Sequence, residues 1–215
     1  MHWRVDELSE RDIYKLLVNT VLPRPIALVT TCDANGGFNA APFSFFNVMG
    51  SEPPIVALGI EANPDKLDGL KDTARNIAQS GEFVVNLVDE ALVYAMNVCA
   101  VDFPTEVDEI SVAGLALATS LQVRAPRIAE SPVQLECRQL TTLLIGPKRH
   151  LIIGEVLHLH IRDDIVDEHL HIDLDRLDLV GRLHGNGWYC RTADRFQVPK
   201  LNLENWLQMT RNTSS

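Results

Sequence analysis

The stretch "RPIALVTTCDANGGFNAAPFSFFNVMG", residues 24–50, contains two β-rich runs around an "NGG" tripeptide at residues 35–37. An Asn-Gly pair readily adopts the positive φ angles that a tight turn between antiparallel strands requires. The stretch therefore predicts a β-hairpin. Pro42 cannot donate a hydrogen bond to a neighbouring strand, so we expect an irregular second strand that leaves backbone N–H groups for a ligand. An edge strand with solvent-facing polar residues is the alternative.

Polar side chains interrupt the apolar part of this stretch at Asn39, Ser44 and Asn47. A buried amide or hydroxyl without a partner costs roughly 1 to 3 kcal/mol. These side chains therefore need partners, either in the protein itself or in something that the protein binds. The first run ends in two further hydroxyls, Thr30 and Thr31.

The rest of the chain alternates strands with short helices. We expect a helix capped by Ser9 that stops at Pro23, a helix that ends at Gly81, and a helix capped by Asp89. Strands are predicted at residues 54–60, 83–88, 131–146 and 151–162, in addition to the hairpin. This pattern favours a mainly β fold, an antiparallel barrel with inserted helices, over repeated β-α-β units.

The composition narrows the classes of partner. The chain has 215 residues, a formal net charge of -10 and a pI of about 5.1. This charge repels phosphate backbones and anionic lipids, so we expect neither a nucleic-acid partner nor a membrane. The N-terminus shows no export signal, and the four cysteines are scattered without a C-x-x-C motif. We therefore expect a cytoplasmic protein with reduced thiols.

The segment "LKDTARN", residues 70–76, predicts a site for an anion. If Asp72 caps a helix, the N–H groups of Thr73 and Ala74 are left unpaired, beside the Thr73 hydroxyl and the Lys71 ammonium. An ordinary capped helix with a solvated lysine is the alternative. The helix could also begin at Asp65, which would leave only side chains to face a ligand.

The segment "GRLHGNGWYCRT", residues 181–192, brings cations and aromatic rings together around two glycines. Such a set suits a flat, anionic cofactor such as a nicotinamide dinucleotide. A glycine-rich hairpin with solvent-facing arginines is the alternative.

Other chemistries find little support in the sequence. Two H-x-H pairs, at residues 158–160 and 169–171, could gather four imidazoles, but the charged loop between them makes half-exposed strand residues the preferred interpretation, and we predict no metal. The chain has no G-x-S-x-G, P-loop or G-x-G-x-x-G motif.

Taken together, several segments resemble the flavin reductase-like family of FMN-binding split-barrel proteins. The segments are "RPIALVTT", "NAAPFSFFN", "KDTARNI", "GEFVVNLV", "RIAESPVQLEC", "LIIGEV" and "VGRLHGNGWYCRT". The similarity covers residues 20–195 in the family's order. It implies a Greek-key split β-barrel, and we expect one domain over residues 1–215 with a C-terminal tail at 196–215.

The resemblance also implies a site and an activity. It implies a homodimer with FMN near the subunit interface, with FAD as the alternative flavin, and NADH or NADPH as co-substrate. His184 and Arg182 are the residues expected to face the nicotinamide. The candidate flavin neighbours are Thr30, Thr31, Asn39, Ala41, Pro42, Phe43, Ser44, Asn47, Lys71, Thr73 and Asn76.

The expected reaction is hydride transfer from NADH or NADPH to N5 of FMN. The flavin carries the reactivity, so the protein need only bind, orient and exclude water. Two alternatives stay open: a flavin-binding electron carrier without a nicotinamide site, and an FMN-dependent redox enzyme that acts on an organic substrate. A partner oxygenase is a further expectation.

Overall fold

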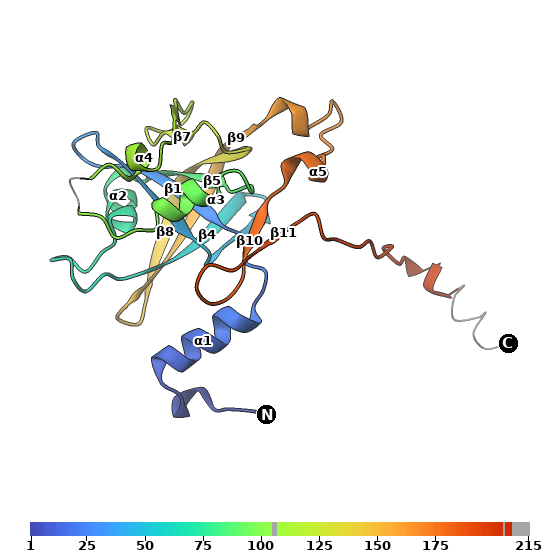
Figure 1. Cartoon of the computed structure of the whole chain (residues 1–215), viewed down its shortest axis with the longest axis horizontal. Coiled ribbons are helices and arrows are strands. Elements are labelled where there is room, and N and C mark those ends of the chain that lie inside the picture. The colour runs from blue at the N-terminus through green and yellow to red at the C-terminus, as the bar shows by residue number, and fades with distance from the viewer. Residues whose placement is uncertain (105–106, 204, 208–215) are drawn as a thin grey trace.

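Strands of the described chain form one seven-stranded antiparallel sheet, in the order β2-β1-β5-β8-β9-β4-β3. The structure is a computed structural model that describes residues 1–104, 107–203 and 205–207 (Figure 1). The predicted mainly β fold with inserted helices is confirmed. The strands of the sheet are β1 (Ala27–Cys32), β2 (Phe38–Phe43), β3 (Phe46–Ser51), β4 (Pro54–Glu61), β5 (Glu82–Leu87), β8 (Val133–Ile145) and β9 (Arg149–Ile161).

The predicted hairpin joins β1 to β2. The two strands pair antiparallel from Ala27 opposite Phe43 to Cys32 opposite Phe38. The turn needs a glycine at residue 36, where φ is 87°. The Asp33 carboxylate closes the turn by accepting hydrogen bonds from the amides of Asn35 (2.7 Å) and Gly37 (2.9 Å).

β2 is an edge strand that pairs with β1 through Pro42 without a register shift, so the predicted irregularity at Pro42 is wrong and the edge-strand alternative is correct. β2 ends at Phe43, Ser44 and Phe45 form a bend, and β3 starts at Phe46. Phe45 stays close to the sheet because its carbonyl accepts a hydrogen bond from the Gly59 amide of β4 (2.7 Å). The chain therefore leaves the regular sheet only after β2, at Ser44.

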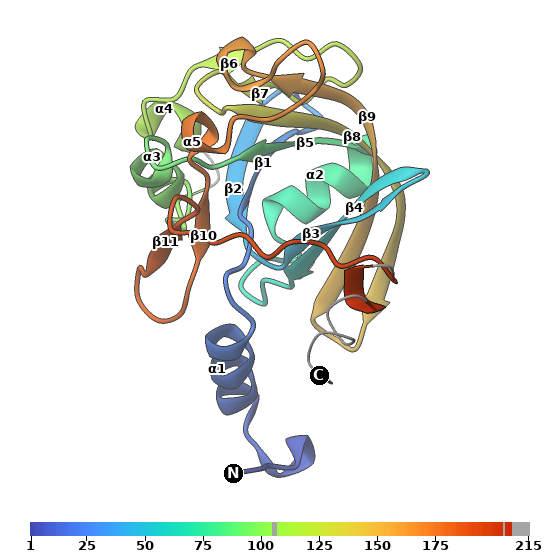
Figure 2. The ribbon, with the colours of Figure 1, turned by 90° about the vertical axis from the view of Figure 1, so that its right-hand side faces the viewer.

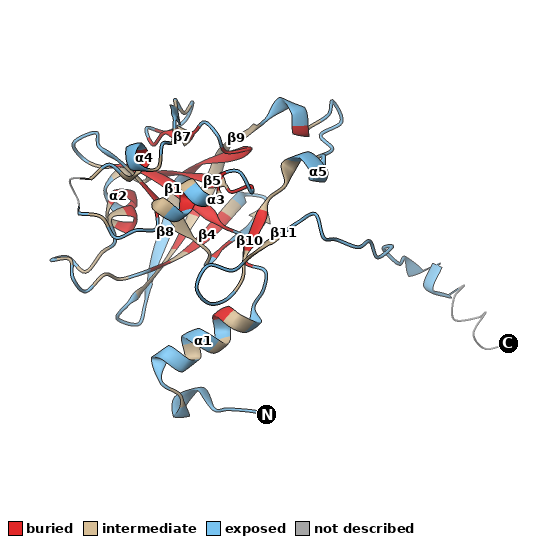
Figure 3. Cartoon of the chain, in the orientation of Figure 1, coloured by how far each residue is buried: buried red, intermediate tan, exposed pale blue. Residues whose placement is uncertain are grey.

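β1 lies between two apolar cores, which explains why all six of its residues are buried. Ala27 and Val29 face the main core inside the curved sheet, and Leu28 faces a second core. Segments inserted between strands contribute to this second core: α3 (Val93–Val98), α4 (Glu109–Val112) and β7 (Arg127–Ile128), which pairs with β6 (Leu117–Ala118). Figure 3 shows the buried strands of the sheet beside α3 and α4, which are more exposed.

Helix α2 (Asp72–Ser80) lies within the curve of the sheet (Figure 2). Its residues Ala74 and Ile77 pack into the main core. Gly81 ends the helix in the left-handed conformation, with φ of 71°, as predicted. The predicted start is wrong: Lys71 holds the N-cap position without a side-chain bond, and Asp72 is the first helical residue. The alternative start at Asp65 is also wrong, because turns occupy residues 64–69.

A short hairpin of β10 (Val180–Arg182) and β11 (Tyr189–Arg191) lies outside the large sheet. Backbone hydrogen bonds in both directions between Arg24 and Arg182, at 3.0 and 2.8 Å, join this hairpin to the start of β1. The described chain also contains the short helical pieces η1 (Val5–Glu7), η2 (Asp163–Ile165) and α5 (Leu174–Leu177).

Helix α1 (Glu10–Thr20) projects from the body of the molecule (Figures 1 and 2). The Ser9 hydroxyl caps it by accepting from the Asp12 amide, as predicted, and the helix ends before Pro23. Val18 is its only buried residue. In the described residues, no helix is both long enough and apolar enough to span a bilayer.

Candidate functional site

The predicted flavin neighbours from two distant segments meet between β2 and α2. The Asn39 side chain donates a hydrogen bond to the Thr73 hydroxyl at 3.2 Å, although the two residues are 34 positions apart in the chain. Lys71 lies just before Thr73 and is exposed. Within the described residues Lys71 forms no ion pair, so its ammonium is available to a ligand.

Three small cavities follow this line of residues and share Pro42 and Phe43 in their walls. We call them together the groove. One cavity, of 130 Å³, contains Asn39, Lys71 and Thr73 in its wall, and the other two, of 170 and 200 Å³, both contain Ser44. Small-molecule pockets usually measure about 300 to 1,000 Å³. A ligand the size of a flavin therefore has to lie across all three cavities.

The N-terminus of α2 opens toward one end of the groove. The first N–H groups of an α-helix have no partner inside the helix, and they attract anions. Asp72 does not use its carboxylate for capping, because it pairs with Arg75 and with Lys66 (3.3 Å). The amides of Thr73 and Ala74 make no hydrogen bond within the described part of the chain. The sequence analysis predicts the same unpaired amides, but from a helix capped by Asp72, whereas the N-cap residue is Lys71.

Carboxylates also stand at this end of the groove. Asp72, Asp102 and Glu109 all line the 130 Å³ cavity, together with Lys71 and Thr73. Burial raises the pKa of Glu109, and the negative charges of Asp72 and Asp108 raise it further. The charge that an anionic ligand meets at this end therefore depends on the protonation of Glu109.

Thr30, Thr31 and Asn76 lie behind the groove. Asn76 donates to the Thr31 hydroxyl at 2.9 Å, and both residues are buried. The Thr30 hydroxyl donates to the Pro126 carbonyl and accepts from Asn86 at 3.1 Å. These side chains are hydrogen-bonded to one another or to the protein and do not line the three cavities, although Asn76 lines a neighbouring cavity of 290 Å³ together with Asn39 and Asp72. Their direct contact with a flavin stays a prediction, and the structure places them where they support β1 and α2.

Asn47 and His184 lie away from the groove. Both are exposed and neither lines its cavities. The Asn47 side chain accepts a hydrogen bond from the next amide, Val48, at 2.8 Å. The side-chain oxygen of Asn47 thus has its hydrogen-bond partner in the protein itself and not in a ligand.

Arg182 does line the groove, in the 200 Å³ cavity with Ser44. Its guanidinium folds back on its own loop, donating to the carbonyls of Gly185 (3.0 Å) and Trp188 (3.3 Å). It also lies over the Tyr189 ring, 4.8 Å from the centroid. The structure therefore brings Arg182, but not His184, to the predicted flavin site.

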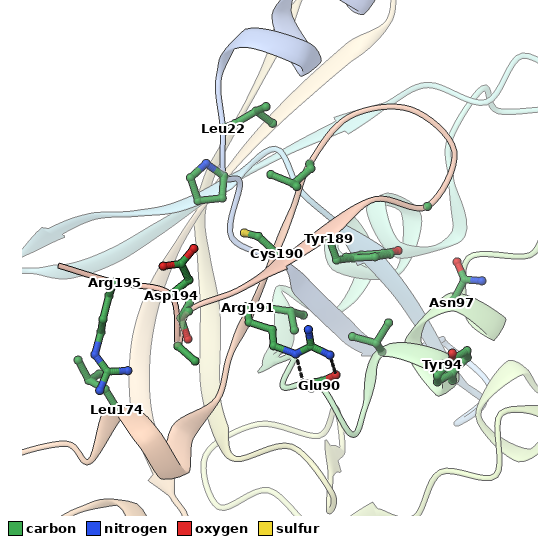
Figure 4. A pocket seen from close by; sticks show the side chains of 17 residues that line it. Leu22, Glu90, Tyr94, Asn97, Leu174, Tyr189, Cys190, Arg191, Asp194 and Arg195 are labelled. Atoms are coloured by element: carbon green, nitrogen blue, oxygen red, sulfur yellow. Dashed lines mark hydrogen bonds and ion pairs between the residues drawn. The ribbon is translucent and has the colours of Figure 1, made fainter.

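A larger cavity of 1350 Å³ lies between the β10–β11 hairpin and α3 (Figure 4). Apolar side chains such as Tyr94 and Leu174 form much of its wall. Its cations are already paired: Arg191 bridges Glu90 (2.6 Å), and Arg195 binds Asp175 (2.6 Å). The cavity shares Asn97 and Tyr189 with the groove. The sequence indicated the hairpin but not α3 as its opposite wall.

Neither H-x-H pair belongs to a cluster that could hold a metal in the described residues. His158 and His160 lie side by side on β9, with ring centroids 4.6 Å apart. His160 bonds the fully buried Glu136 at 2.6 Å. The Glu136 carboxylate also accepts from the amides of Leu121 (2.8 Å) and Gln122 (2.6 Å), so this pair fastens a loop to the sheet.

Sequence reasoning missed Arg24, which is 8% exposed and bonds Ser44 in the groove. A charged residue directly before the apolar strand "PIALV" was the available signal. Such a residue is usually solvated, so the pattern alone does not distinguish a solvated arginine from a buried one that bonds the site.

Several groups of the groove could hold a phosphorylated flavin. An ammonium, a hydroxyl and helix amides at one end suit a phosphate. Amide and hydroxyl groups from Asn39 and Ser44 suit ribityl and ring-edge atoms, and the apolar surface of Pro42 and Phe43 suits a flat ring system.

Comparison with known proteins also points to flavin chemistry. The sequence model of the flavin reductase like domain matches residues 19–180. Pseudomonas fluorescens 2-nitrobenzoate 2-nitroreductase NbaA has a similar structure, with 34% identity, a TM-score of 0.85, and coverage of 94% of this chain and 98% of that one. Nitrilotriacetate monooxygenase component B from Bacillus cereus is 31% identical, with a TM-score of 0.86 and coverage of 92% and 98%.

A third structure identifies the architecture. A Shewanella frigidimarina protein, described as a flavin reductase with a split barrel domain, has a TM-score of 0.79 at 20% identity and covers 94% of this chain and 100% of that one. The predicted split-barrel fold is thereby confirmed. The chain belongs to the flavin reductase-like domain family, whose fold and flavin-related oxidoreductase chemistry it shares.

Proposed function

We propose that this protein binds FMN along the groove and acts as an NAD(P)H-dependent flavin reductase. The observation that carries the proposal is the hydrogen bond between Asn39 and Thr73, which brings the two predicted ligand segments into one site. Family membership supports flavin chemistry in general. The choice of FMN rests on the anion-binding features of Lys71, Thr73 and the start of α2.

Each group has a distinct task in this proposal. Lys71, Thr73 and the first amides of α2 hold the phosphate, and Asn39 holds the ribityl chain. Ser44 meets the polar edge of the ring, which lies on Pro42 and Phe43. The bound flavin supplies the capacity to accept a hydride from the nicotinamide. Arg182, in the wall of the groove, faces the dinucleotide.

Titration of the purified protein tests the cofactor. FMN, FAD and riboflavin are added separately, and flavin absorbance and fluorescence quenching are followed. We expect FMN to bind most tightly, because riboflavin lacks the phosphate and FAD must accommodate an adenosine. Equal affinity for FMN and riboflavin would contradict the phosphate assignment, and failure of all three to bind would contradict the flavin site.

Steady-state oxidation of NADH and NADPH with added FMN tests the reaction. Turnover supports the reductase. Absence of turnover with retained flavin binding supports an electron carrier without a nicotinamide site.

A second candidate function is an FMN-dependent enzyme that reduces an organic substrate. It is favoured by the 1350 Å³ cavity that shares Asn97 and Tyr189 with the groove. The 34% identity to a 2-nitrobenzoate 2-nitroreductase adds support. Anaerobic mixing of the reduced flavoprotein with 2-nitrobenzoate distinguishes the functions, because rapid reoxidation of the flavin indicates an acceptor site.

We also propose a homodimer with the flavin near the subunit interface. The small volumes of the groove cavities support this proposal, because a second copy could close the open side. A partner oxygenase is proposed from the 31% identity to component B of nitrilotriacetate monooxygenase. Rate enhancement of such an oxygenase by this protein and NADH is the corresponding measurement.

A further inference from the structure

Arg24 is a buried cation without a buried counter-charge. It is 8% exposed, and within the described residues it forms no ion pair. Charged groups in protein interiors are usually paired, because removing a charge from water is costly. Burial lowers the pKa of Arg24, but a guanidinium remains charged at physiological pH. The hydrogen bonds of the Arg24 guanidinium show what this buried charge does in the fold.

The three nitrogens of Arg24 contact three separate parts of the fold. Nη1 donates to the Val18 carbonyl at the end of α1 (2.6 Å), and Nη2 donates to the Leu183 carbonyl after β10 (3.0 Å). Nε donates to the Ser44 hydroxyl in the bend between β2 and β3 (3.3 Å). One planar group thus fixes α1, the β10–β11 hairpin and the groove relative to one another.

The bond to Ser44 determines what that hydroxyl can offer a ligand. An arginine can only donate hydrogen bonds, so the Ser44 oxygen must act as the acceptor. Its own proton must then point elsewhere. In the described part of the chain Ser44 donates no hydrogen bond, and its side chain lines two cavities of the groove. The Ser44 O–H is therefore left free to donate to a ligand in the groove or to water.

We propose that Arg24 is a positioning residue that holds the Ser44 hydroxyl as a hydrogen-bond donor toward an acceptor atom of the flavin. This inference rests on the proposed flavin site. It predicts that the contribution of Ser44 to binding depends on Arg24. It also predicts that a side chain with a single donor nitrogen, such as lysine, cannot replace Arg24. The three hydrogen bonds start from three different nitrogens of the guanidinium.

A double-mutant cycle with FMN as the probe tests the proposal. The variants are Ser44→Ala, Arg24→Lys and the combination, and the dissociation constant is measured by fluorescence quenching. Ser44→Ala should weaken FMN binding about threefold to tenfold when Arg24 is present, as expected for one hydrogen bond. In the Arg24→Lys background the same change should have little effect. Additive effects would overturn the proposal, since a residue that only stabilises the fold would leave the contribution of Ser44 unchanged.

Further variants keep the result interpretable. Ser44→Thr retains a hydroxyl and should recover most of the affinity lost in Ser44→Ala. Arg11→Lys on α1 is the matched control for the arginine change, because Arg11 is exposed. If Arg24→Lys does not fold, as judged by a cooperative thermal transition, the cycle is repeated with Arg24→Gln. Failure of both to fold would make Arg24 a structural residue and overturn the proposal. Failure of the unaltered protein to bind FMN would instead contradict the proposed function.

Discussion

Asn39 and Thr73 illustrate what the sequence could and could not predict for single residues. The family resemblance predicted that both lie near one ligand, and the structure brings them within 3.2 Å. The polarity of each segment alone could not predict this contact, because residues 34 positions apart meet only through the tertiary fold. Arg24 stayed outside the prediction for the same reason: its acceptors include Leu183, which is 159 positions away.

Lys71 and Thr73 form the phosphate end of the proposed site, and their replacement gives the first prediction. Lys71→Ala combined with Thr73→Val should weaken FMN binding by about 2 to 3 kcal/mol, because a charge-assisted and a neutral hydrogen bond are both lost. Isothermal titration calorimetry provides the measurement. Riboflavin binding serves as the control and should change little. Equal losses for both flavins would place the phosphate elsewhere.

Glu109 makes the affinity for FMN dependent on pH. Because its pKa is raised, mainly by burial, Glu109 loses its negative charge at a higher pH than an ordinary glutamate. Lowering the pH through this pKa therefore removes a repulsion from the phosphate end of the groove and should tighten FMN binding. Glu109→Gln should tighten FMN binding at pH 7 by about 1 kcal/mol and reduce the pH dependence.

Riboflavin again separates the possible causes of this effect. It has no phosphate, so its affinity should be insensitive to Glu109→Gln. The phosphate of FMN itself titrates near pH 6. The comparison between variant and unaltered protein, made at each pH, isolates the part due to Glu109. A variant with weaker FMN binding at pH 7 would contradict the prediction.

Glu136 supports the fold and gives a prediction for stability. Burial alone would raise its pKa, but the hydrogen bonds from Leu121, His160 and Gln122 outweigh burial and lower it. A lowered pKa means that the ionised carboxylate stabilises the native state. This contribution is present above the ordinary pKa of a glutamate and is lost as the pH falls through the lowered pKa.

Glu136→Gln should therefore reduce the free energy of unfolding by about 3 kcal/mol at pH 7, because the amide cannot accept all of these bonds. The loss should shrink as the pH falls below 4. Urea denaturation at several pH values provides the measurement. Glu155→Gln is the matched control: Glu155 pairs with Arg138 at 2.7 Å in an exposed ion pair, which contributes at most about 1 kcal/mol. Equal losses in the two variants would contradict the prediction.

At the scale of elements, hairpins and strands were predicted well because their signals are local. The "NGG" turn and the run "PIVALGI" correspond to the β1–β2 hairpin and to β4. The N-cap of α2 was predicted at Asp72, one residue after its true position at Lys71. An aspartate at such a place can either cap the helix or pair with a cation. Arg75 and Lys66 decide between the two, and that choice depends on their positions in space.

The packing of β5 against β9 gives a prediction at this scale. Gly154 of β9 lies against the fully buried Phe83 of β5, and a Cβ atom at residue 154 would lie 2.8 Å from Cε1 of the Phe83 ring and closer still to its Cζ. Gly154→Ala should therefore overpack the core and reduce the free energy of unfolding by about 1 to 3 kcal/mol. Chemical denaturation measures the change.

A second substitution tests the cause of that loss. Phe83→Leu replaces the ring by a smaller side chain and removes the clash. The Gly154→Ala/Phe83→Leu double variant should therefore lose less free energy of unfolding than the two single variants lose together. Gly50→Ala is the control, because its nearest neighbour would be at an ordinary 3.4 Å. A strictly additive double variant would show that the clash with Phe83 is not the cause.

At the scale of the whole molecule, several apolar side chains are exposed at the far end of β8. β8 is buried from Val133 to Cys137, but from residue 140 onward its apolar side chains are about half exposed. Helix α1 likewise presents Tyr14 and Leu17 to solvent. Exposed apolar side chains that gather on one part of a protein commonly mark an interface between proteins. Sequence patterning could not show it, because a strand with apolar residues on both faces is also typical of a fully buried strand.

The dimer prediction follows from this surface. At micromolar concentration, sedimentation should give a species of about twice 24.0 kDa, because burying these side chains against a second copy removes apolar area from water. Leu144→Lys should shift the protein toward the monomer, since Leu144 is 64% exposed at the end of β8. Leu67→Lys is the matched control, as Leu67 is fully exposed in a loop. If the flavin lies near the interface, Leu144→Lys should also weaken FMN binding, and a monomeric variant with unchanged affinity would separate the groove from the interface.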